Sequence, residues 1–67
     1  MKTVTAVAKE LGIKPGTLRY WVYKFEEELE RKGFIKREKA FKLTRYYVLV
    51  SPEEFIDELH RLQQERV

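Results

Sequence analysis

The sequence predicts a mostly helical fold that carries one small β-hairpin. Three observations support this prediction. Apolar residues recur with the period of a helix over residues 4–29 and again over residues 55–62. Residues 34–50, between these stretches, are rich in aromatic and β-branched side chains and show no helical stripe. Glycine, serine and proline stand at the borders of these segments. We therefore expect the order helix, turn, helix, hairpin, helix.

The first two helices are predicted from their ends and their apolar faces. Thr3 can accept a hydrogen bond from the first turn of a helix, and Gly12 can end that helix because glycine adopts the left-handed conformation without a Cβ penalty. Ile13 then fills the corner, and Pro15 suits the first position of a second helix, which we expect to continue to about residue 32. The apolar face of the first helix consists of Val4, Val7, Ala8 and Leu11. The buried stripe of the second consists of Leu18, Trp21, Val22, Phe25 and Leu29.

The remaining elements are a hairpin and a last helix. We expect strands near residues 34–37 and 45–50, joined by a basic loop that lacks the Asn-Gly or Asp-Gly pair of a tight turn. Ser51 can cap the last helix, Pro52 suits its first position, and Glu54 completes a capping box. Its apolar face consists of Phe55, Ile56, Leu59 and Leu62. Two helices joined by a glycine turn and followed by a hairpin and a third helix form a winged helix-turn-helix.

Length and composition limit the possible functions. A chain of 67 residues predicts a single domain over residues 1–67, which buries only about 60% of its unfolded surface and is marginally stable. Cysteine is absent and His60 is the one histidine, so disulfides, thiolate metal sites and histidine clusters are excluded. We expect no cofactor. No apolar run approaches the roughly 18 residues of a membrane span, and the N-terminus lacks the core of a signal peptide, so we expect a cytoplasmic, nucleoid-associated protein.

Positive charge is concentrated in two segments. The net charge of +3 is modest, but residues 1–25 and 36–47 each hold five cations and one carboxylate. Residues 26–35 and 48–67 are net acidic. If the two basic segments adjoin in the fold, they form one positive face, which is typical of nucleic-acid binding.

Residues 3–21, TVTAVAKELGIKPGTLRYW, resemble the N-terminal motif of MerR-type winged-helix regulators. The matching positions are Thr3, Val7, Ala8, Lys9, Gly12, Pro15, Thr17, Leu18, Arg19 and Tyr20. The segment SPEEFIDEL, which begins at Ser51, is similar to the third helix of that family. The resemblance implies that the second helix enters the major groove of DNA and that the wing contacts the backbone.

The chain also departs from the MerR pattern. Lys14 stands where the family has a serine cap, the stretch between Tyr20 and Phe34 is longer, and the usual Gly-Tyr-Arg of the wing is missing. The sequence ends where the family continues into a dimerising coiled coil and an effector domain, so we expect no small-molecule effector. Smaller relatives with a lone domain, such as RacA-like chromosome-anchoring proteins and phage excisionases, are nearer in expected role.

We predict non-catalytic binding of double-stranded DNA, by a transcriptional regulator or by an architectural protein of a chromosome or plasmid. The second helix supplies major-groove and phosphate contacts, the hairpin supplies cations, and the first helix approaches the backbone. One module reaches few phosphates, so we expect a homodimer or cooperative side-by-side binding. The predicted DNA-binding residues are Thr5, Lys9, Lys14, Gly16, Thr17, Arg19, Tyr20, Lys24, Lys36, Arg37, Lys39, Lys42 and Arg45.

Other interpretations remain open. Arg19 and Lys24 could be ordinary solvated charges, Tyr20 could cover the edge of the core, and the hairpin cations could only prevent edge-to-edge pairing. The competing function is a protein interaction module that uses the acidic helix faces. An enzyme is disfavoured, because no acidic residue is paired with a serine or histidine at a meaningful spacing.

Overall fold

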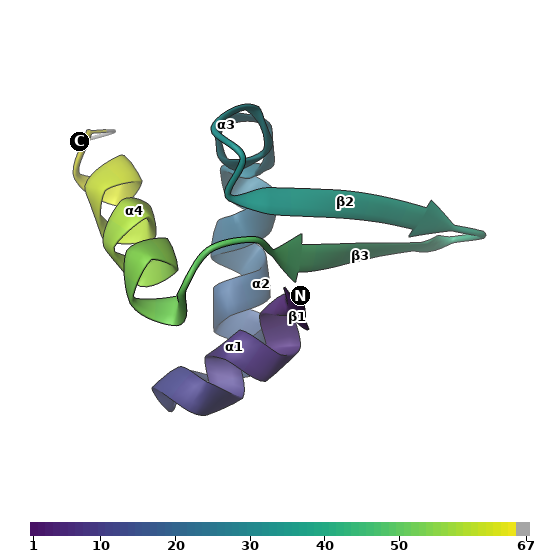
Figure 1. The fold of residues 1–67 in the computed structure, drawn as a ribbon, viewed down its shortest axis with the longest axis horizontal. Helices are drawn as coiled ribbons and strands as arrows, with labels where there is room; N and C mark the ends of the chain where they lie inside the picture. The colour runs from purple at the N-terminus through teal and green to yellow at the C-terminus, as the bar shows by residue number, and fades with distance from the viewer. Residues whose placement is uncertain (66–67) are drawn as a thin grey trace.

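The computed structural model describes residues 1–65 and confirms a mostly helical winged helix-turn-helix (Figure 1). Two-residue strand β1 leads directly into the first helix, α2 and α3 follow, and the hairpin β2–β3 precedes the long helix α4. The bounds are β1 Lys2–Thr3, α1 Val4–Leu11, α2 Pro15–Lys24, α3 Glu26–Arg31, β2 Ile35–Ala40, β3 Leu43–Val48 and α4 Pro52–Glu65.

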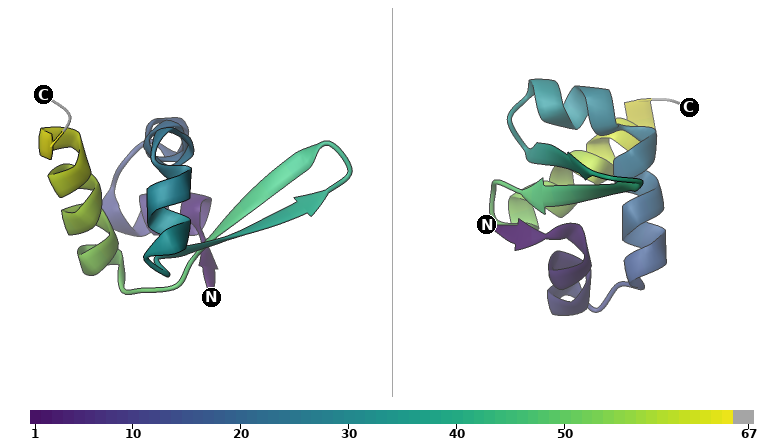
Figure 2. Two further views of the ribbon diagram at one scale, coloured as in Figure 1. Left: turned by 90° about the horizontal axis from the view of Figure 1, so that it is seen from above. Right: turned by 90° about the vertical axis from the view of Figure 1, so that its right-hand side faces the viewer.

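The core lies where the helices meet the base of the hairpin. Phe25, Leu29 and Phe55 are among its largest fully buried side chains, and Ile35 and Val48 close it from the two hairpin strands. The predicted apolar faces of the first, second and last helices all contribute to this core. Helix α4 covers one side of α2, and the hairpin projects from the other side (Figures 1 and 2). The hairpin therefore leaves the body of the molecule next to the exposed face of α2.

The predicted turn between the first two helices is confirmed. The hydroxyl of Thr3 accepts a hydrogen bond from the backbone N–H of Ala6 at 3.2 Å. Gly12 ends α1 with a φ of +70°, and the N–H of Ile13 donates to the carbonyl of Ala8 at 2.9 Å. Pro15 begins α2, whose preceding residue supplies no side-chain cap. These local interactions fix the angle between α1 and α2.

The predicted single second helix is wrong, because the helix breaks at Phe25. This residue has φ −112° and ψ 23°, and α3 starts immediately after it in a new direction (Figures 1 and 2). Three glutamates, Glu26, Glu27 and Glu28, thereby occupy the first turn of α3. Carboxylates at a helix N-terminus are stabilised by the helix dipole, whereas in the middle of a helix adjacent carboxylates would repel each other. The break also turns the acidic segment away from the start of α2.

The predicted basic loop of the hairpin is also wrong. The strands pair from Ile35 opposite Val48 to Ala40 opposite Leu43, so the turn between the strands is tight. Phe41 adopts a φ of +57°, a left-handed conformation that is usually taken by glycine or asparagine and is therefore not predicted for a phenylalanine. Strand β1 was not expected either, and it pairs with β3 to make the sheet order β1-β3-β2. The cations that were assigned to the loop lie instead on the strands and the turn.

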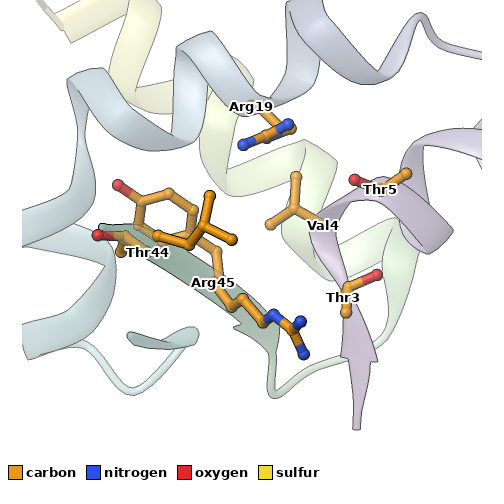
Figure 3. A pocket seen from close by; sticks show the side chains of 8 residues that line it. Thr3, Val4, Thr5, Arg19, Thr44 and Arg45 are labelled. Carbon is orange, nitrogen blue, oxygen red and sulfur yellow. The ribbon is translucent and has the colours of Figure 1, made fainter. Parts of the chain in front are cut away.

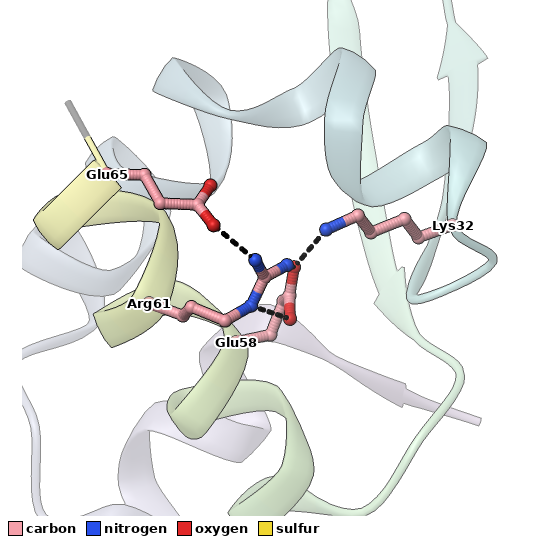
Figure 4. A network of polar contacts seen from close by, with 4 residues as sticks. All are labelled: Lys32, Glu58, Arg61 and Glu65. Carbon is pink, nitrogen blue, oxygen red and sulfur yellow. Dashed lines mark hydrogen bonds and ion pairs between the residues drawn. The ribbon is translucent and has the colours of Figure 1, made fainter.

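Helix α4 begins and docks as its sequence predicts. Its first turn is capped by Ser51, whose hydroxyl accepts a hydrogen bond from the N–H of Glu54 at 3.3 Å. Further along, the carboxylate of Glu58 pairs with Lys32 at 2.7 Å and with Arg61 at 2.5 Å (Figure 4). The link to Lys32 connects α4 to the end of α3. The guanidinium of Arg61, which also contacts Glu65, lowers the pKa of Glu58 below its ordinary value of 4.5, and Lys32 adds to this effect.

The lowered pKa of Glu58 predicts a loss of stability in acid. A carboxylate whose pKa is lower in the folded state contributes its full stabilisation of the fold at pH values above its pKa in the unfolded state. This contribution disappears as the pH falls through its pKa in the folded state. We expect Glu58→Gln to cost about 1 kcal/mol at neutral pH and to flatten the decline in the free energy of unfolding below about pH 4.5. Urea denaturation from pH 7 to pH 3 measures both effects. The matched control is Glu65→Gln, because Glu65 is more exposed and reaches Arg61 alone. Parallel pH profiles for wild type and Glu58→Gln would contradict the prediction.

Candidate nucleic-acid interface

The exposed face of α2 is centred on Tyr20. Residues three and four positions apart are neighbours on a helix, so Gly16, Thr17, Tyr23 and Lys24 surround this tyrosine. The side chains of Tyr20 and Tyr23 are 57% and 65% exposed. The structure therefore leaves a polar and aromatic face of α2 open to solvent.

A groove of about 530 Å³ separates this face from the hairpin. The α2 side of the groove is lined by Gly16, Arg19, Tyr20 and Tyr23, and the hairpin side by Lys42, Leu43, Thr44 and Tyr46. The two basic segments of the sequence thus face one hollow. One cation from each segment, Arg19 and Lys42, lines this groove.

A second hollow of about 260 Å³ adjoins the first near the start of α1. Figure 3 shows that Arg19 from α2, Thr5 from α1 and Arg45 from β3 lie around it. Arg19 lines both hollows and so stands at the boundary between them. Its guanidinium can donate hydrogen bonds to an anionic group in either one.

Four cations of the groove and its adjoining hollows have no carboxylate partner among the described residues. Within residues 1–65, Arg19, Lys39, Lys42 and Arg45 form no ion pair within 4.0 Å. Their positive charge is consequently available to a ligand, and an exposed group of like charges attracts a polyanion most strongly at low salt.

Arg37, in contrast, is engaged within the protein. Its guanidinium contacts the carboxylates of Glu26 at 3.1 Å and Glu30 at 2.6 Å. The hydrogen bond from Arg37 lowers the pKa of Glu30, and the same bond raises the pKa of Arg37. Tyr46 adds a third link by donating its hydroxyl to Glu26 at 2.6 Å. Arg37 therefore holds the hairpin against α3.

The links to α3 also define the protonation state of Tyr46. Burial of the phenol, followed by its hydrogen bond to Glu26, raises the pKa of Tyr46 to about 12. The phenol is thus neutral at physiological pH and remains a donor to the carboxylate. Because Tyr46 also lines the groove, this contact ties the hairpin wall of the groove to α3.

Several predicted residues lie outside the lining of the groove. The ammonium of Lys24 lies 5.5 Å from the centre of the Trp21 ring, in a cation–π contact, and Lys24 borders the glutamates of α3. Lys9 and Lys14 are exposed at the end of α1 and in the following turn, and Lys36 is exposed near the base of the hairpin. Lys39 lines an adjoining hollow beside Tyr23 and Thr44. The predicted residues that the structure gathers around the groove are Thr5, Gly16, Arg19, Tyr20, Lys42 and Arg45.

Four groove residues are not among those that the sequence predicts to bind DNA. Tyr23 follows Tyr20 by three positions, so helical spacing alone could have placed it on the exposed face. Leu43, Thr44 and Tyr46 could be placed only once the hairpin register was known, because a shift of one residue moves each side chain to the other face.

Comparison with known proteins supports a helix-turn-helix DNA-binding domain. Residues 2–66 match a helix-turn-helix family that is described as transposase. No curated protein and no solved structure matches the chain. Among the described helices, none combines the length and the apolar character that crossing a membrane requires. The match extends over nearly the whole chain, and it agrees with a helix-turn-helix that turns an open, cationic face outward. The chain therefore belongs to the transposase helix-turn-helix family and is a DNA-binding domain of the helix-turn-helix kind.

Proposed function

We propose that the groove between α2 and the hairpin holds one sugar-phosphate strand of duplex DNA. The exposed face of α2 lies in the major groove, and the hairpin crosses the strand towards the adjacent minor groove. The observation that carries this proposal is the position of Arg19, which lines both hollows and faces unpaired cations of the hairpin across them. A ridge of phosphates between Arg19 on one wall and Lys42 and Arg45 on the other would neutralise these three cations, which form no ion pair within residues 1–65.

The side chains divide into phosphate contacts and base contacts. Arg19, Lys42 and Arg45 contact phosphates, because they line the hollows on both walls. Thr17 and Tyr20 lie on the outer face of α2, where they approach base edges. No protein atom lies within 4 Å of a Cβ built at Gly16, so its missing side chain leaves room for DNA instead of serving the fold.

The biological role follows from the kind of duplex that the domain selects. The family description favours a domain that brings a transposition protein to DNA. The resemblance of residues 3–21 to MerR-type regulators favours a transcriptional regulator or an architectural protein of a chromosome or plasmid. In each role the domain binds DNA without catalysing a reaction on it, and it requires no cofactor. A single domain reaches few phosphates, so we propose that two copies bind side by side or as a homodimer.

A second candidate function uses the acidic surface. Glu26, Glu27 and Glu28 line a hollow of about 410 Å³ with Tyr23 and Lys24, and a basic protein segment could bind there. Such a complex would not involve the hairpin cations. Duplex binding that is insensitive to salt, or absent at low salt, would favour this function over DNA binding.

Replacement of Thr17 tests direct reading of bases. In selection from a random duplex pool, we expect Thr17→Ala to change the preferred base at one or two positions, with a loss of discrimination of about 1–3 kcal/mol. The dependence of affinity on salt should stay as in wild type, because threonine neutralises no phosphate. Gln64→Ala, an exposed change near the end of α4, is the control and should select the same sites as wild type. Identical selected sites for Thr17→Ala and wild type would remove Thr17 from the proposed contacts.

A further inference from the structure

Phe41, at the tip of the hairpin, has no role in the fold. It is 103% exposed, so its ring packs against nothing. Its φ of +57° is a left-handed conformation that is strained for a residue with a Cβ. Glycine or asparagine would relieve this strain and would expose less apolar surface. Neither packing nor backbone geometry therefore accounts for a phenylalanine here.

The surroundings of Phe41 indicate the class of its partner. Lys42 follows it directly, and Lys39 and Arg45 lie on the adjoining strands without an ion pair in the described part of the chain. An aromatic ring among unpaired cations suits a ligand that offers both negative charge and flat apolar surface. The stacked bases of a nucleic acid, with their flanking phosphates, have this combination.

The reach of the hairpin fits a duplex. Each strand has six residues, and at about 3.3 Å per residue the hairpin is about 20 Å long from its base in the core to its tip. The centres of adjacent major and minor grooves are separated by about half of a 34 Å turn, or roughly 17 Å. With α2 in the major groove, the tip arrives at the minor groove. A tight turn is narrow enough to enter a groove that is about 6 Å wide.

We propose that Phe41 is a wedge that inserts between two base pairs from the minor groove, partly unstacks them and bends the duplex. This inference rests on the proposed function, because it requires that the groove binds a duplex. Apolar side chains inserted in this way unwind and kink DNA at flexible steps, so Phe41 would add selectivity for deformable sequences without hydrogen bonds to bases.

The test compares Phe41→Asn with wild type in two assays. Asparagine tolerates the left-handed conformation, so the hairpin is retained while the ring is lost. Relaxed closed-circular plasmid is treated with topoisomerase in the presence of each protein, and the change in linking number measures unwinding. We expect wild type to unwind the plasmid and Phe41→Asn to lose this activity at equal occupancy. Affinity for a 24-base-pair duplex should fall about tenfold, with an unchanged salt dependence.

Three further variants make the result specific. Phe41→Trp keeps an aromatic plane and should retain unwinding. Lys42→Gln should reduce the slope of log K against log salt by about 0.9 but should still unwind once binding is saturated. Leu49→Asn removes another exposed apolar side chain, beyond the base of the hairpin, and should behave as wild type.

The outcomes separate this inference from the proposed function. Duplex binding by wild type without unwinding, or equal unwinding by Phe41→Asn, overturns the wedge and leaves DNA binding intact. Absence of duplex binding by wild type at low salt overturns both. A third outcome is that Phe41→Asn sediments differently from wild type without DNA but binds and unwinds DNA as wild type does. This result would assign Phe41 to contact between copies of this chain and would also overturn the wedge.

Discussion

A variant in which Arg19, Lys42 and Arg45 are all replaced by glutamine is expected to lose most of its affinity for duplex DNA. Each cation that neutralises one phosphate contributes about 0.9 to the slope of log K against log salt, so the slope should become less steep by roughly 2.7. If counterion release is the main contribution, affinity at 0.1 M salt should fall by roughly several hundredfold. Fluorescence anisotropy with a labelled duplex over a range of salt concentrations measures both quantities.

The matched control changes the same net charge on the other side of the molecule. Arg31, Lys32 and Arg61 lie on or next to α3 and on α4, and two of them are already paired with Glu58. Their combined replacement by glutamine should leave the salt slope nearly unchanged, because none of these side chains lines the groove. An equal loss of slope in both variants would mean that net charge, and not the groove, attracts the DNA.

Replacement of Phe55 by alanine is expected to unfold much of the protein at room temperature. Phe55 is completely buried between α4 and the rest of the core, and truncation of such a ring costs about 3–5 kcal/mol. A domain of 67 residues has a total free energy of unfolding of only about 3–10 kcal/mol. Because α4 and the helix-turn-helix share this core, we expect the loss to appear as one cooperative transition of the whole domain. Thermal and urea denaturation followed by circular dichroism measure it.

The neighbouring residue provides the control for Phe55. Ile56 is half-buried at the edge of the core, so Ile56→Ala should cost clearly less. Two separate transitions in Phe55→Ala, with the melting of α4 preceding that of the helix-turn-helix, would contradict a single domain over residues 1–67. A change in the free energy of unfolding below about 1 kcal/mol would contradict the central position of Phe55 in the core.

Local signals predicted the helix-turn-helix well. Thr3, Gly12 and Ser51 act through hydrogen bonds and backbone conformations that span only a few residues, so their effects can be inferred from the sequence. The apolar stripes of α1 and α4 were likewise confirmed, because side-chain period and helix geometry are directly related. The turn between α1 and α2 and the start of α4 are for this reason the most predictable parts of the chain.

The break at Phe25 and the register of the hairpin depended on distant contacts. An apolar stripe from Leu18 to Leu29 is equally compatible with one helix and with two, and the choice depends on where the glutamates of α3 meet Arg37 and Tyr46. Without a turn motif, the strands could be aligned only by the burial of Ile35 and Val48 in the core.

The helix-turn-helix, the two basic segments and binding to DNA in general could all be inferred from the chain's residues. Three features required the folded structure: Arg37 is paired with carboxylates of α3, Arg19 faces hairpin cations across the hollows, and the ring of Phe41 is fully exposed at the tip. Ion pairing and exposure depend on residues far apart in the chain, whereas helix ends and apolar periodicity depend on near neighbours.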